Sequence, residues 1–94
     1  MKKYSVYIMS NLHRTVLYVS VTSDLMSRVQ QHKSGEGGVF TTAYKCHYLL
    51  YYEDYDHISK AIEREKNLKN WRREWKLDLI KEENPGMKDL AADW

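Results

Sequence analysis

Four side chains in the first third of the sequence are of the types that phosphodiester chemistry uses. Tyr7 and Tyr18 each lie in a short run of β-branched and aromatic residues, and Arg28 and His32 stand four residues apart in a stretch with helical spacing. Helical residues with that separation share one face. A phenol, a guanidinium and an imidazole that lie together can position a water, hold a phosphate and relay a proton. Taken singly, each is more often a packing or surface residue, so only their combination indicates a site.

A fifth residue, Glu65, adds a carboxylate at an unexpected position. On a helical wheel it falls within the apolar stripe made by Ile58, Ala61 and Leu68. A glutamate that faces inward must be paired, protonated or bound to a metal. Two interpretations stay open. One is a structural ion pair, either with Arg28 or with a cation of the last helix. The other is a ligand for a hard cation such as Mg²⁺.

Positive charge gathers between residues 60 and 76, where Trp71 and Trp75 are interleaved with the basic residues. A solvated helix face with ion pairs explains this pattern, and so does a face that contacts phosphates. The net charge of +2 is a weak argument for nucleic acid by itself. The candidates for nucleic-acid binding are Arg64, Lys69, Arg72, Arg73 and Lys76.

The hydrophobic pattern predicts the elements that would position these side chains. Strands are expected at 4–9, 16–21 and 47–53, with a helix at 24–32 after the second strand. The near-continuous apolar run of the third strand favours a central place in the sheet. A long helical stretch follows it, and a shift in its apolar phase predicts a break near 70–72, with the last helix running to about residue 81.

Two loops are close to the candidate residues. Residues 11–15 are polar enough to form a hairpin loop, and a loop of even length would place Tyr7 and Tyr18 directly opposite each other on one face of the sheet. The glycine-rich segment 34–38 follows His32. It is either a mobile loop that closes over a ligand or a plain connector.

The bulk composition predicts one folded domain that spans residues 1–94. A hydrophobic content of 43% argues against disorder, and the single cysteine, Cys46, excludes an internal disulfide. No stretch approaches the ~20 apolar residues of a membrane span, and no signal peptide is evident. A cytoplasmic location is therefore the default expectation, and no membrane partner is expected.

The order of these residues resembles the GIY-YIG endonuclease domain family. The resemblance is to its small stand-alone bacterial members, which are similar to the N-terminal nuclease domain of an excision-repair endonuclease. It covers nearly the whole chain, and the ordered set of segments is more specific than any one of them. The segments, in chain order, are Val6–Ile8, Tyr18–Ser20, Val21–Arg28 with His32, Phe40-Thr41 with Tyr44, Tyr51–Glu53, Ala61–Lys69, Trp71-Arg72, Asn84-Pro85 and Asp89-Leu90.

The resemblance implies an α+β fold, with a small three-stranded antiparallel sheet flanked by helices. It also implies that the chain is a metal-dependent endonuclease that acts on DNA, in repair or recombination. The expected metal is Mg²⁺ or Mn²⁺, with Glu65 as its ligand. The expected catalytic residues are Tyr7, Tyr18, Arg28, His32 and Glu65, and we predict that all five converge on one cleft.

Each of these residues has an expected role. Arg28 would stabilise the charge that develops on the phosphate. Tyr7 would take the proton of the attacking water, which requires nearby cations to lower its pKa, and Tyr18 and His32 would position that water or relay the proton. Ser20 departs from the pattern, because the family has glycine there. A serine side chain is expected to crowd a position that glycine leaves open to substrate.

Two other functions stay open. The first is a nucleic-acid-binding module of the same fold that has lost cleavage. The second is a structural or interaction protein in which the tyrosines and Glu65 form a buried polar network. DNA is the expected partner of an endonuclease and of a binding module alike, and the sequence is compatible with a homodimer or with a larger repair partner.

Overall fold

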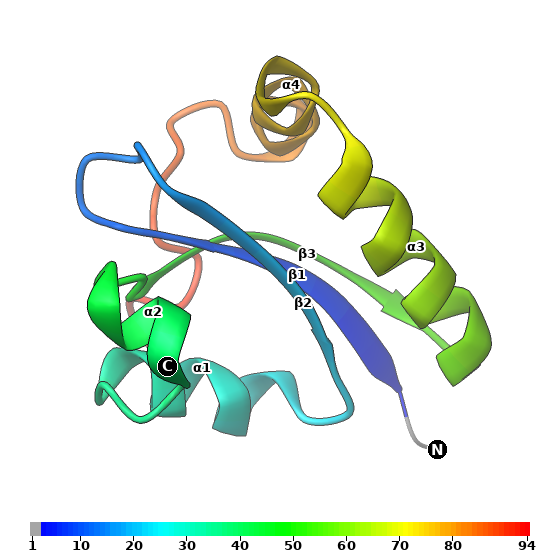
Figure 1. The fold of residues 1–94 in the computed structure, drawn as a ribbon, viewed down its shortest axis with the longest axis horizontal. Coiled ribbons are helices and arrows are strands. Elements are labelled where there is room, and N and C mark those ends of the chain that lie inside the picture. Colours follow the sequence, from blue (N-terminus) through cyan, green and yellow to red (C-terminus); the bar gives the residue numbers. More distant parts are fainter. Residues whose placement is uncertain (1–2) are drawn as a thin grey trace.

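The computed structural model describes residues 3–94, in which a three-stranded antiparallel sheet is flanked by four helices (Figure 1). The predicted α+β class is therefore confirmed. The strand order is β2-β1-β3, so β1 is central and the other two strands are edges. The elements are β1 (Tyr4–Ser10), β2 (Leu17–Thr22), α1 (Leu25–Lys33), α2 (Val39–Ala43), β3 (Tyr48–Tyr55), α3 (Ile58–Asn70) and α4 (Arg73–Glu83).

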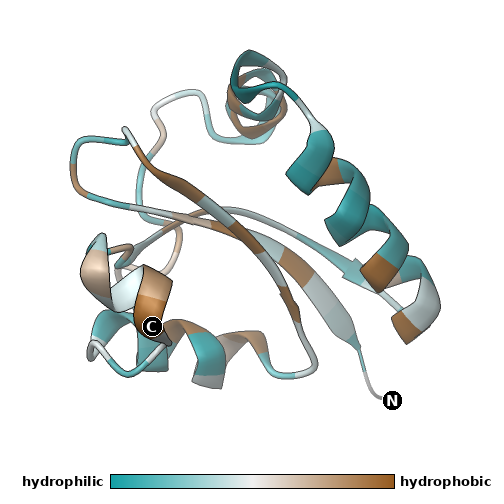
Figure 2. Cartoon of the chain, in the orientation of Figure 1, coloured by the Kyte–Doolittle hydropathy of each residue, from teal (hydrophilic) through white to brown (hydrophobic). Residues whose placement is uncertain are grey.

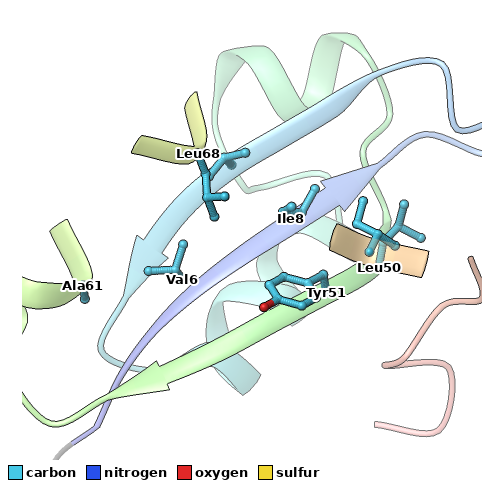
Figure 3. Packing of buried hydrophobic residues seen from close by; sticks show 8 residues of the cluster. Val6, Ile8, Leu50, Tyr51, Ala61 and Leu68 are labelled. Atoms are coloured by element: carbon cyan, nitrogen blue, oxygen red, sulfur yellow. The ribbon is translucent and has the colours of Figure 1, made fainter. Parts of the chain in front are cut away.

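The two faces of the sheet carry different helices, because successive side chains of a strand point to opposite sides. Val6 and Ile8 of β1 pack against Ala61 and Leu68 of α3 (Figure 3), and α4 adds to this layer. The intervening side chains of β1, among them Tyr7, face α1 instead. The molecule thus has a layer made by α3 and α4, a sheet, and a layer that includes α1.

The prediction that β3 is central is wrong. β1 takes that place, and its side chains from Ser5 to Ser10 are all buried. The apolar run of β3 has another cause, since the C-terminal segment lies along it. The amide of Leu90 donates to the carbonyl of Leu49, and the amide of Leu49 donates to the Asp89 carboxylate.

The first hairpin has a register that differs by two residues from the prediction. Tyr7 is opposite Ser20, and Tyr18 is opposite Met9, so the two tyrosines share a face but lie diagonally. The side-chain oxygen of Asn11 accepts from the amides of Thr15 and Val16, at 2.9 and 3.1 Å. This side-chain-capped turn fixes the hairpin register, which the alternation pattern alone could not specify.

The break between the last two helices is confirmed at Trp71, whose backbone is extended. The two helices can then each turn an apolar side to the sheet, and their outer sides are hydrophilic (Figure 2). The α4 helix continues to Glu83, slightly beyond the expected end. Within the described residues, no helix has the length and apolar character needed to cross a membrane.

Candidate active site

The site is built around a hydrogen bond between Tyr7 of β1 and His32 of α1. Both side chains are almost completely buried, and the Tyr7 hydroxyl lies 2.9 Å from His32 Nε2. His32 Nδ1 lies 3.2 Å from Thr41 Oγ1 on α2, and that hydroxyl donates to the carbonyl of Gly38. One arrangement of protons satisfies all three contacts. Tyr7 donates to Nε2, and Nδ1–H donates to Thr41.

A glycine allows the loop after α1 to close over the imidazole. Gly37 is buried, and a Cβ atom built on it would lie 2.1 Å from His32 Nδ1. No side chain fits in that space. The segment 34–38 thus packs against the His32 imidazole, which hydrogen bonds to Tyr7 and Thr41 also orient.

Arg28 lies one turn before His32 and is half-buried. Its guanidinium donates to Gln31 Oε1 at 2.7 Å and to the carbonyl of Gly37 at 3.2 Å. Its charge also reaches the two central groups, since it lowers the pKa of both His32 and Tyr7. The predicted pairing of Arg28 and His32 on one helix face is therefore present in the structure.

Burial controls the proton affinities of the central pair. It lowers the pKa of His32 to about 4, and the positive charge of Arg28 acts in the same direction. The imidazole is therefore neutral near pH 7. Burial also raises the pKa of Tyr7, although a hydrogen bond from Ser20 and the charge of Arg28 oppose that rise. The cation Arg28 does lower the pKa of Tyr7 as expected, but the expected net lowering is wrong, because desolvation outweighs the cation and the pKa ends above its ordinary value.

Ser20 lies beside the Tyr7 phenol. The two residues are direct partners in the ladder between β1 and β2, so their side chains share a face, with Cβ atoms about 5 Å apart. The hydrogen bond from Ser20 favours the ionised form of Tyr7. The serine that replaces the motif glycine therefore contacts the phenol itself.

Tyr18 extends the site toward the surface. Its ring centroid is 5.7 Å from that of His32, in an edge arrangement, and 5.6 Å from that of Phe40, in a stacked arrangement. Phe40 in turn lies 4.7 Å from Tyr44. Gly37, Thr41 and the two added aromatic residues had no role in the sequence-based site. The signals available for them were the glycine-rich segment itself and the segment Phe40-Thr41 with Tyr44 in the family resemblance.

Glu65 stands apart from the other four predicted residues. Its side chain is mostly buried, at 15% exposed, and it forms an ion pair with Lys69 of the same helix at 3.4 Å. However, α3 covers the face of the sheet opposite to Tyr7. The structure therefore joins Tyr7, Tyr18 and His32 by direct contacts, with Arg28 beside them, and gives no contact between Glu65 and that group in the described residues. The prediction that Glu65 shares one cleft with the other four stays a prediction.

The five cations proposed for nucleic-acid binding lie on α3 and α4, also across the sheet from His32. Arg64 forms an ion pair with Glu53 at 2.6 Å. This carboxylate offsets much of the positive charge that Arg64 could offer to a phosphate. The Glu53 carboxylate also accepts from the hydroxyls of Tyr51 and Tyr55. This buried network is a structural feature that the sequence did not reveal. Three of the other four cations take part in local contacts: Lys69 with Glu65, Arg72 with the ring of Trp75, and Arg73 with the carbonyl of Arg14. Burial and the like charge of Arg73 lower the pKa of Lys76.

Comparison with known proteins identifies the family to which this arrangement belongs. The family model described as the GIY-YIG catalytic domain matches residues 3–78. The chain belongs to the GIY-YIG family. Membership in this family generally denotes nuclease activity, and the sequence-based resemblance is confirmed.

Similar proteins include small members of the same family. A UPF0213 protein of Staphylococcus aureus strain Mu3 is 38% identical over 66 residues, which is 70% of this chain and 80% of that protein. The UPF0213 protein of strain N315 matches to the same extent. The solution NMR structure of a UPF0213 protein from Bacillus halodurans shares the fold, with a TM-score of 0.59, 22% identity and 97% coverage of both chains.

Proposed function

We propose that this GIY-YIG protein is a metal-dependent endonuclease that hydrolyses phosphodiester bonds in DNA, with repair or recombination as its setting. The main support is the buried hydrogen bond between Tyr7 and His32 with Arg28 beside it. It joins, on one face of the sheet, residues at three of the motif positions, in a chain that the family model covers from residue 3 to residue 78.

The proton path follows from the direction of these hydrogen bonds. Tyr7 is protonated at neutral pH, because burial raises its pKa, and it already donates to the neutral His32. As the attacking water gives a proton to the Tyr7 oxygen, Tyr7 passes its own proton to His32 Nε2, and the water oxygen bonds to phosphorus while the bond from phosphorus to the leaving ester oxygen breaks. The leaving oxygen takes a proton from solvent, and His32 returns its added proton to solvent through Tyr7. The phenol thus acts without first becoming a phenolate.

Arg28 supplies the positive charge for the phosphate. Its acceptors Gln31 and the carbonyl of Gly37 are neutral, and among residues 3–94 no ion pair with a carboxylate engages the guanidinium. A phosphate oxygen would form stronger, charge-assisted hydrogen bonds in their place. The developing charge of the transition state would strengthen these bonds further.

Glu65 is the residue that would hold the metal ion. Mg²⁺ takes one or two carboxylates and several waters, and this carboxylate is mostly buried with a half-exposed lysine as its ion-pair partner. The described residues contain no cluster of three or more His, Cys, Asp or Glu side chains that could hold a metal ion. The metal would supply charge stabilisation at the scissile phosphate.

The edge strand β2 explains how residues on two faces can act on one substrate. The α3 helix packs across β1 and β2, and β2 has no further strand beyond it. A DNA strand that crosses this edge would meet Tyr18 from one face and α3 from the other. This arrangement is part of the proposal.

A nucleic-acid-binding module without cleavage is the second candidate, and one observation favours it. The Tyr7 side chain has no exposed surface, so water reaches its hydroxyl only if the surrounding side chains move. The two candidate functions differ in their dependence on a divalent metal ion. An endonuclease needs it for turnover, whereas binding alone depends on salt.

The test is cleavage of supercoiled, branched and single-stranded DNA with and without Mg²⁺ or Mn²⁺. We expect metal-dependent cleavage that Glu65→Gln abolishes. Glu63→Gln, at an exposed glutamate two residues earlier, is the matched control and should cleave normally. Loss of the ion pair with Lys69 should cost only about 0–1 kcal/mol, so thermal melting should change little. No cleavage by the parent protein on any of these DNA forms, with salt-sensitive binding, would contradict the endonuclease and support the second candidate.

A further inference from the structure

Three aromatic rings continue outward from the active site. We define the aromatic platform as Tyr18, Phe40 and Tyr44. The rings of Tyr18 and Phe40 are stacked with an interplanar angle of 25°, and Phe40 contacts Tyr44 with an angle of 40°. The inner end of the platform touches His32. The rings therefore form a continuous path from the buried imidazole to the surface.

The outer part of the platform is exposed. Phe40 is 44% exposed and Tyr44 is 52% exposed, and both come from α2 and its C-terminal end. Thr41 is the buried residue of this short helix, so these rings are not needed to attach α2 to the core. Figure 2 shows that α2 includes apolar residues. Exposed aromatic surface gathered beside a site is a feature of ligand-binding surfaces.

The charge around the platform favours an anionic ligand. Residues 3–23 and 37–52 contain no aspartate or glutamate. A cavity of about 390 Å³ adjoins the platform, since Tyr44 lines it together with the basic or titratable residues His13, Lys45 and His47. A phosphate placed there would meet no repelling carboxylate from the residues that line it.

We propose that the platform binds the unpaired bases of a single DNA strand, with the cavity at Lys45 taking the adjacent backbone. Open aromatic faces flanked by cations are the recognition elements of single strands, because each base offers a face for stacking and each nucleotide a phosphate. Bases in a duplex are already stacked on one another and cannot use the rings. The choice of DNA rests on the proposed function, whereas the preference for unpaired bases rests on the platform.

The test is binding without cleavage, in buffer free of divalent metal. Fluorescence anisotropy compares a labelled thymidine oligonucleotide with a duplex of the same length. We expect tighter binding of the single strand, and we expect Phe40→Ala and Tyr44→Ala each to raise its Kd about 5- to 100-fold. Phe40→Trp, which keeps a ring, should retain binding. Thermal melting shows whether each variant is folded. If Phe40→Ala is unfolded, Tyr44→Ala alone tests the platform.

Two controls make the result specific. Phe40→Leu keeps an apolar side chain without a ring, and should weaken binding as Phe40→Ala does. Trp75→Ala removes an exposed aromatic residue from α4, and should leave binding unchanged. Equal affinity for the duplex, full binding by Phe40→Leu, or loss of binding in Trp75→Ala alone would each overturn the proposal.

The outcome is separable from that of the cleavage experiment. Ring-dependent binding of single strands by a protein that never cleaves would uphold the platform and refute the endonuclease. Metal-dependent cleavage of single strands and duplexes at equal rates, unaffected by Phe40→Ala, would uphold the endonuclease and refute the platform.

Discussion

His32 determines the proton balance of the site, because it is a buried imidazole that accepts from one hydroxyl and donates to another. Its pKa is lowered from 6.5 to about 4, mainly by burial. Between pH 6.5 and about pH 4, His32 is therefore mostly protonated in the unfolded chain and mostly neutral in the folded protein. Stability linked to this residue is complete above pH 6.5 and is lost as the pH falls toward 4.

This linkage gives a prediction for the free energy of unfolding. Between pH 7 and pH 5, protonation of His32 in the unfolded chain should lower the free energy of unfolding by about 2 kcal/mol. His32→Gln removes the titration, so the variant should be less stable at pH 7 but should lose about 2 kcal/mol less than the parent on acidification. Urea unfolding of both proteins at several pH values measures the difference. Parallel pH dependence of the two curves would show that the imidazole is not kept neutral by the fold.

Ser20 gives a second prediction at this scale, because its side chain has two opposing effects on Tyr7. Its hydroxyl favours the ionised phenol, and its bulk occupies a position where the motif has glycine. Ser20→Ala removes only the hydroxyl, so we expect slower cleavage than in the parent protein. Ser20→Gly also removes the crowding, so we expect it to cleave faster than Ser20→Ala, at a cost of about 0.5–1 kcal/mol in stability. Equal rates for the two variants would show that crowding is irrelevant.

Some site residues could be predicted from the sequence, and others could not. Arg28 and His32 share a helix face because of their spacing, and Tyr7 and Tyr18 share a sheet face because of strand alternation. The side of the sheet on which α3 lies depends on the chain path between β3 and α3. A helical wheel carries no such information. The wheel placed Glu65 on the apolar side of its helix, and the side chain is mostly buried. The wheel could not show which face of the sheet that side of the helix covers.

At the scale of elements, the segment 34–38 has a role that its composition did not reveal. Its glycine content suggested a mobile loop or a connector, whereas the structure has Gly37 buried against His32. Sequence patterns report backbone freedom but not which neighbour approaches. The hairpin register was missed for a related reason, since the Asn11 turn sets it through side-chain hydrogen bonds.

A substitution at Gly37 tests this packing. In Gly37→Ala the added methyl group would meet His32 at 2.1 Å, so either the ring or the loop must move. We expect a loss of about 1–3 kcal/mol in stability and a marked loss of cleavage, as for an overpacked core position. Gly86→Ala is the matched control, because its Cβ would meet only the flexible Lys88 side chain at 3.3 Å. Similar melting temperatures for Gly37→Ala and the parent protein would contradict the tight contact.

At the scale of the whole molecule, the sheet separates two chemical environments. The α1 side holds the buried Tyr7–His32 pair and opens onto the aromatic platform. The other side carries α3 and α4, with Glu65 and with cations that are partly paired within the protein. The fold class was predictable because strand and helix periodicities differ clearly. The order of the strands was not, because β3 owes its apolar run to the C-terminal segment.

The central claim is that the Tyr7–His32 pair performs phosphodiester cleavage, and the initial rate of metal-dependent DNA cleavage by Tyr7→Phe tests it most directly. Phenylalanine keeps the buried ring and removes only the hydroxyl, which leaves His32 Nε2 unpaired at a cost of about 1–3 kcal/mol. Tyr52→Phe is the control, because Tyr52 pairs with Tyr7 from β3 and is partly exposed. We predict a rate loss of about 100-fold or more for folded Tyr7→Phe and a normal rate for Tyr52→Phe. Parent-like cleavage by Tyr7→Phe would contradict the claim.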